Sequence, residues 1–195
     1  MTQEAAEAHT LLTRKASLEN HSLLHSWSLH NNNNATYRES KRNTPCNWFG
    51  ITCNVVGKVR EINLFDANLR GKLDNFSFSS FPDLTILNLS SNALHGTIPA
   101  HIGTLTKLKI LDLSMNRFFN VLPLSLGNLT QLTTLYIIEN SISGTIPQEI
   151  GYLKNLMELG LSSNFLTGSI PPSLGHLMKL TTLYLHRNNI SGCIP

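Results

Sequence analysis

The chain has 195 residues and a formal net charge of +3, from 15 Lys and Arg against 12 Asp and Glu. The charge is diffuse and no basic patch is interleaved with aromatic residues, which excludes a nucleic-acid-binding protein. No stretch approaches the roughly 20 apolar residues that cross a bilayer. Met1 is followed by neither a basic segment nor an apolar run, so the sequence predicts neither a membrane span nor a signal peptide.

The N-terminal segment differs in character from the rest of the chain. The stretch "EAAEAHTLLTRKASL" carries apolar residues at helical spacing, among them Ala8, Leu11 and Leu12, and predicts a helix. A second short helix is predicted over residues 21–27. A polar, Asn-rich stretch over residues 28–44 predicts a loop.

From residue 84 onward the sequence repeats itself. The first position of the repeat is occupied, every 24 residues, by Leu84, Leu108, Leu132, Leu156 and Leu180. The pattern L-x-x-L-x-L-x-x-N-x-L with a period of roughly 20 to 29 residues predicts a leucine-rich repeat. Because the L-x-L pair alternates as a strand does, Leu87 and Leu89 should point inward and Asn88 outward.

The predicted fold is an α/β repeat, a solenoid with a parallel sheet on its concave face. Stacked turns bury a common core that no single turn can bury alone. Strands are expected near residues 62–64, 87–89, 111–113, 135–137, 159–161 and 183–185. One Asn of each turn should satisfy buried backbone groups of its neighbours, as a structural ladder rather than a catalytic set: Asn92, Asn116, Asn140, Asn164 and Asn188.

The tail of each turn is more specific. "LHGTIPAHIGTL", "ISGTIPQEIGYL" and "LTGSIPPSLGHL" resemble the plant-specific repeats of cell-surface receptor kinases, receptor-like proteins and polygalacturonase inhibitors. One repeat departs from this pattern, with Asn120 at the Gly position and Leu122 for Ile. A degenerate turn begins at Val59 and has Ala67 at the ladder position, which suits a terminal repeat.

The helix and the segment "PCNWFGITC" resemble the N-terminal cap of plant leucine-rich-repeat receptors. The resemblance implies a cap over residues 1–58 with a disulfide between Cys46 and Cys53, and about six turns over residues 59–195, the last incomplete. A zinc site is excluded because no His clusters near these cysteines. Cys193 is expected to be a free thiol or the partner of a cysteine outside this chain.

The resemblance also implies an extracellular location, at the cell surface or in the apoplast. A secreted receptor needs a signal peptide, which the sequence does not show, and the last turn is incomplete at Pro195. The whole protein is therefore expected to be longer at both ends. Six sequons agree with this location, although a sequon is only an acceptor that is used when exposed. The candidate glycosylation sites are Asn20, Asn34, Asn75, Asn88, Asn128 and Asn189.

Nothing in the sequence predicts catalysis, a cofactor or a metal. His21 and His25 are four residues apart, but no third ligand lies near them. Neither a nucleophile elbow nor a kinase signature is found. The chain itself is therefore not expected to be an enzyme.

A binding function is expected instead. Exposed aromatic, apolar and charged residues at outward strand positions are candidates for ligand contact: Phe65, Tyr136, Ile138, Glu139, Tyr184 and Arg187. The resemblance implies a peptide or protein ligand and a leucine-rich-repeat co-receptor, with a kinase outside this chain. The alternative is a soluble cell-wall enzyme inhibitor of the polygalacturonase-inhibitor type.

Overall fold

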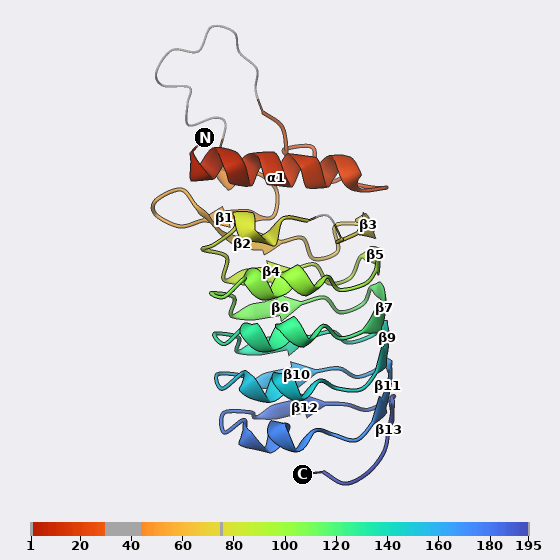
Figure 1. Cartoon of the computed structure of the whole chain (residues 1–195). Coiled ribbons are helices and arrows are strands. Elements are labelled where there is room, and N and C mark those ends of the chain that lie inside the picture. The colour runs from red at the N-terminus through yellow and green to blue at the C-terminus, as the bar shows by residue number, and fades with distance from the viewer. Residues whose placement is uncertain (1, 30–43, 75, 195) are drawn as a thin grey trace, which may run out of the picture.

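The computed structural model describes residues 2–29, 44–74 and 76–194. They form a stack of turns closed at its N-terminal end by a helix, α1 (Gln3–Ser17) (Figure 1). The hydroxyl of Thr2 accepts the amide N–H of Ala5 and caps the start of α1. Ala8 and Leu11 face the stack and are buried, as their helical spacing predicts.

The second helix expected over residues 21–27 is not formed. The amides of Leu24 and Trp27 donate to the carbonyls three residues earlier, of His21 and Leu24, so the segment is a run of tight turns. Trp27 fixes this path because its indole nitrogen donates to the carbonyl of Phe49 at 2.9 Å and its ring is buried. Tertiary anchoring, rather than helical periodicity, sets the conformation here.

The disulfide predicted between Cys46 and Cys53 is present, with the two Cα atoms 5.3 Å apart. Cys46 lies in the short helix η2 (Pro45–Asn47) and Cys53 ends β1 (Ile51–Cys53). Between them, Trp48 is buried and stacks on Trp27 at 5.8 Å. The loop that the disulfide closes therefore carries one half of an aromatic pair in the cap.

A seven-stranded sheet forms one face of the stack. Its first pair is antiparallel, β1 with β2 (Val59–Asn63), and all later pairs are parallel. The remaining strands are β4 (Ile86–Asn88), β6 (Ile110–Asp112), β8 (Thr134–Tyr136), β10 (Glu158–Gly160) and β12 (Thr182–Tyr184). From β4 onward they begin one residue before the predicted positions, and the predicted inward leucines are in register, as Leu87 is with Leu111.

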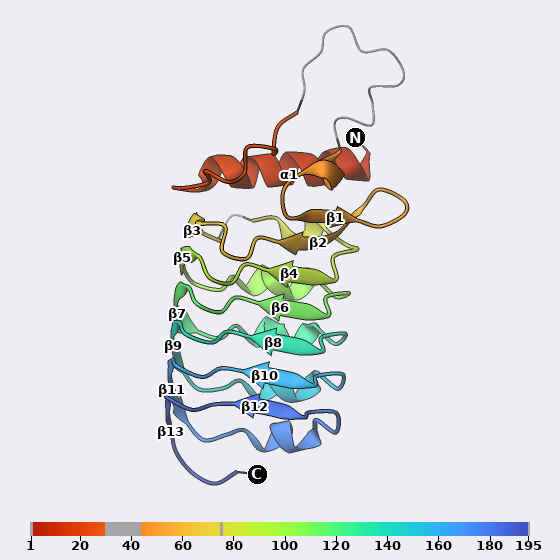
Figure 2. The same cartoon turned by 180° about the vertical axis from the view of Figure 1, so that it is seen from behind.

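A second sheet was not predicted. It runs along one edge of the stack, beside β2 to β12 (Figure 2). Its strands are β3 (Arg70–Lys72), β5 (Ala93–Gly96), β7 (Arg117–Val121), β9 (Ser141–Gly144), β11 (Phe165–Gly168) and β13 (Asn189–Ile190).

Short 3-10 helices cover the face opposite the seven-stranded sheet, as the two views together show. They pack closely because glycine lines them: a Cβ on Gly103 would lie 2.5 Å from the carbonyl oxygen of Ser125 in the next turn. The helices are η3 (Phe78–Ser80), η4 (Ala100–Thr104), η5 (Leu124–Asn128), η6 (Gln148–Tyr152) and η7 (Pro172–His176).

The predicted Asn ladder runs through the core between the two sheets. The side chain of Asn164 accepts the amide of Ile142 at 3.0 Å and donates to the carbonyl of Ile137 at 2.7 Å. Asn92 makes equivalent bonds to the amide of Leu69 and the carbonyl of Leu64, so the ladder also reaches the degenerate first turn. Each amide satisfies backbone groups that the stacked turns leave unpaired.

Candidate ligand-binding surface

The side chains of the seven-stranded sheet that point away from the core form a surface that we call the outer sheet face. Equivalent residues of successive turns form columns on this face, because each turn repeats the strand and the bend that follows it. In the bend that follows the strand, the last residue on this face has a left-handed backbone, with φ of 53° at Glu139 and 55° at Arg187. Strand alternation would place Ser90, Ser114 and Ser162 on this face, but the structure buries all three.

The structure brings Tyr136 and Ile138 together over a glycine. Cβ built on Gly160 would lie 2.7 Å from a carbon of each of these side chains, so both lean across the backbone of the next strand. The Tyr136 hydroxyl donates to the Glu158 carboxylate. Burial, and then this carboxylate, raise the pKa of Tyr136 to about 12. The phenol therefore stays protonated and serves as a donor.

Tyr184 continues this group on the far side of Gly160. Tyr136, Gly160 and Tyr184 share one register across β8, β10 and β12. The Tyr184 ring is 44% exposed and meets the ring of His186 edge-on at 6.3 Å. Arg187 follows directly in the chain. Tyr136 on β8 and Tyr184 on β12 thus lie on either side of Gly160, on the strand between them.

The remaining contact candidates are more distant. Phe65 is 57% exposed but follows β2, which β4 and β6 separate from β8. Glu139 and Arg187 occupy the same column two turns apart, with Ser163 between them. Sequence reasoning missed Glu158 and Gly160. The small size of Gly160 next to two bulky neighbours in register was the signal that could have identified it.

The predicted glycosylation sites have different surroundings. Asn128 and Asn189 are exposed, whereas Asn20 and Asn88 are half-buried and make hydrogen bonds. Exposure favours Asn128 and Asn189 as acceptors. Asn34 and Asn75 lie outside the described residues.

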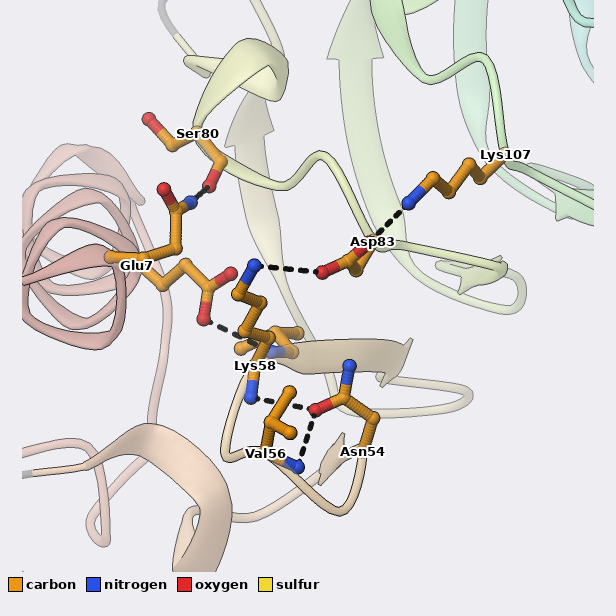
Figure 3. Close-up of polar contacts among 9 residues, drawn as sticks. Glu7, Asn54, Val56, Lys58, Ser80, Asp83 and Lys107 are labelled. Carbon is orange, nitrogen blue, oxygen red and sulfur yellow. Dashed lines mark hydrogen bonds and ion pairs between the residues drawn. The ribbon is translucent and has the colours of Figure 1, made fainter.

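Polar contacts join the cap to the first turns (Figure 3). The carboxylate of Glu7, on α1, is buried and accepts the amide of Val59 at 3.0 Å. Farther out, Asp83 forms ion pairs with Lys58 at 3.4 Å and Lys107 at 2.5 Å. The hydrogen bond from Lys107 is the main reason why the pKa of Asp83 is lowered. These contacts fix α1 and three successive turns relative to one another.

The second carboxylate oxygen of Glu7, Oε1, is buried and has no hydrogen-bond partner within the described part of the chain. Burial raises the pKa of Glu7 above its ordinary value of 4.5, and the bond from the Val59 amide opposes this only in part. Because the folded-state pKa is the higher one, the folded protein favours the protonated carboxyl. Its contribution to stability is complete below the unfolded-state pKa and is lost as pH rises through the folded-state pKa.

We therefore expect Glu7→Gln to improve stability more at neutral than at acidic pH. The neutral amide keeps an acceptor for Val59 and removes the cost of a buried charge. Urea denaturation of both proteins at about pH 5 and pH 7 measures the difference in unfolding free energy at each pH. An equal difference at the two pH values would show that Glu7 does not titrate differently in the folded state.

No group of three or more His, Cys, Asp or Glu side chains that could hold a metal occurs in ranges 2–29, 44–74 and 76–194. In those same ranges no helix is long and apolar enough to cross a membrane. Cys193 is exposed and unpaired among the described cysteines.

Two family matches account for most of the chain. Residues 4–54 match the family described as "Leucine rich repeat N-terminal domain", and residues 58–193 match "Leucine-rich repeat region". The chain belongs to the leucine-rich-repeat family. Neither match is to a catalytic domain, and kinase relatives align with this chain only through their repeat-containing part.

The leucine-rich-repeat relatives are plant receptors. The chain is 41% identical over 98 residues to a probable leucine-rich repeat receptor-like protein kinase of Arabidopsis thaliana, an alignment that covers 50% of this chain and 8% of the relative. The chain thus spans less than a tenth of that kinase.

Solved ectodomains of plant receptor kinases share its fold. The ectodomain of GASSHO1/SCHENGEN3 from Arabidopsis thaliana, in complex with CASPARIAN STRIP INTEGRITY FACTOR 2, superposes with a TM-score of 0.82 at 33% identity, over 100% of this chain and 22% of that one. The structure of the Arabidopsis receptor kinase HAESA with the peptide hormone IDA and the co-receptor SERK1 gives a TM-score of 0.69 at 30% identity. That match covers 95% of this chain and 33% of the HAESA chain.

Proposed function

We propose that this chain is part of the extracellular region of a plant cell-surface receptor kinase and that its outer sheet face helps to bind a peptide or protein ligand. Signalling would pass through a kinase domain that lies outside this chain, and a leucine-rich-repeat co-receptor would be a further partner. The observation that carries the proposal is a group of three side chains on the outer sheet face, Tyr136, Ile138 and Tyr184, which we call the aromatic group. The ligand-bound GASSHO1/SCHENGEN3 and HAESA structures support it by similarity.

The aromatic group has the properties of a binding hot spot. Aromatic side chains contribute a large contact area, and few residues carry most of the binding energy of an interface. Tyr136 is already held by Glu158 and by its contact with Gly160, so little conformational entropy remains to be lost when a ligand binds. Tyr184, two strands away, and Arg187 are exposed and supply an apolar surface and a charge.

The double variants Tyr136→Ala/Ile138→Ala and Tyr184→Ala/Arg187→Ala, made in the full-length receptor, test the proposal. Each should lower affinity for a ligand purified on the wild-type receptor from secreted plant peptides, by about tenfold or more, because each removes hot-spot contacts. Surface abundance and ligand-triggered kinase signalling are measured in parallel.

Phe165→Ala is the matched control, because Phe165 is an exposed aromatic residue of β11 in the second sheet. It should leave affinity unchanged. Normal affinity of both double variants at normal abundance would place ligand recognition elsewhere. A full-length protein that is soluble and blocks a cell-wall-degrading enzyme would instead establish the inhibitor function.

A further inference from the structure

Two carboxylates flank Tyr136 on the outer sheet face. Asp112 on β6 is in register with Tyr136, and Glu158 on β10 accepts a hydrogen bond from the Tyr136 hydroxyl. Both acids are half-buried. Asp112 and Glu158 lie on strands separated by one strand, so the strands that carry them are about 10 Å apart. Tyr136 therefore has one carboxylate on each of the two strands next to its own.

Among the described residues, these charges have no basic partner. The five parallel strands from β4 to β12 contain neither Lys nor Arg. In the part of the chain that the structure describes, neither Asp112 nor Glu158 forms an ion pair. The Asp112 carboxylate accepts only the backbone amide of Ser114, at 2.9 Å. Lys109, just before β6, is bonded to neither acid. The Tyr136 bond uses one oxygen of Glu158 and leaves the other open to a ligand.

We propose that Tyr136, Glu158 and Asp112 form a subsite for a cationic side chain, the ammonium or guanidinium group of a Lys or Arg in the ligand. The face of an aromatic ring attracts such a cation within about 6 Å of its centroid. Glu158 accepts a charge-assisted hydrogen bond from the cation, and Asp112 adds attraction from the other side. Ile138 and Tyr184 provide apolar contact for the methylene groups of the same side chain.

The surroundings favour an organic cation over a metal ion or an anion. A divalent metal requires several oxygen ligands, and no group of three candidate ligands exists within residues 2–29, 44–74 and 76–194. An anion would be repelled by both carboxylates. The same negative field contributes to the raised pKa of Tyr136, for which Glu158 and Asp112 are among the causes.

The inference deepens the proposed function and rests on it. Its test is a selection of peptides from a displayed random library on the whole chain. The double variant Glu158→Gln/Asp112→Asn keeps the shape and the hydrogen-bond acceptors but removes both charges. Glu149→Gln is the matched control, because Glu149 lies in η6 on the opposite face of the stack. Thermal unfolding verifies that all three proteins are folded.

Peptides recovered on the wild-type chain and on the Glu149→Gln variant should be enriched in Lys and Arg, and the enrichment should vanish on the double variant. A single basic peptide from the pool should bind the double variant about tenfold more weakly, as expected for loss of a charged hydrogen bond, and its binding should weaken with added salt. Tyr136→Phe, which frees the second oxygen of Glu158, should retain the preference for basic peptides.

Two other results would overturn the inference in different ways. The first is a set of peptides whose binding requires Tyr184 but which are not enriched in Lys and Arg, or are enriched equally on the double variant. This result would refute the cationic subsite alone. Absence of any peptide whose binding depends on Tyr136 or Tyr184 would refute both the subsite and the proposed role of this face.

Discussion

Replacing Asn164 by alanine should lower the free energy of unfolding by about 3 kcal/mol, the cost of leaving buried polar groups unsatisfied. The side chain is buried, and its oxygen accepts the amide of Ile142 at 3.0 Å. Its nitrogen donates to three carbonyls, that of Ile137 at 2.7 Å among them. Alanine offers no donor or acceptor, and the space is surrounded by protein, so water cannot easily replace the bonds.

Urea denaturation of the whole chain measures this loss, and Asn155→Ala is the matched control. Asn155 also bonds across turns, to the carbonyl of Thr130 at 3.0 Å and from Lys179 at 2.8 Å, but these contacts are exposed. Its replacement should cost less than about 1 kcal/mol, because water replaces the lost bonds. Similar losses for the two variants would mean that burial of the ladder is not what makes Asn164 stabilising.

The repeat pattern predicts the inward positions well because packing is a constraint that each turn satisfies separately. Leu87 and Leu111 are in register because both must fill the same core position. The second sheet escapes prediction for the opposite reason. In β11 only Leu166 is fully buried, and the strand exists through hydrogen bonds with β9 and β13 rather than through a long alternating pattern.

Prediction of the outer sheet face from the sequence is limited in the same way. Alternation places Tyr136 and Tyr184 on one side of the sheet, but the direction in which Tyr136 leans depends on the empty position at Gly160 in the next turn. The buried serines are a second example. Ser114 is drawn inward because its hydroxyl accepts the amide of Ile138 at 3.1 Å, a contact between turns that strand alternation does not contain.

Replacing both Cys46 and Cys53 by serine should destabilise the cap by about 2.5 kcal/mol, the chain-entropy estimate for a closed loop of about eight residues. The effect should be local. The disulfide loop holds Trp48 against Trp27, and Trp27 in turn donates to the carbonyl of Phe49 within the same loop. Hydrogen exchange should therefore accelerate in β1 and in the 24–27 turns before it does in β8 or β10.

Cys193→Ser serves as the control for loss of a thiol, because Cys193 is exposed and far along the chain from the cap. It should change neither stability nor exchange. Since each turn of a solenoid contacts mainly its neighbours, a local loss at the cap reaches later turns only through the first interface. That interface includes the contact of Glu7 with Val59 and the Lys58–Asp83–Lys107 ion pairs, so destabilisation should decline from β2 to β6. Equal acceleration of exchange in every strand would instead mean that cap and repeats unfold as one cooperative unit.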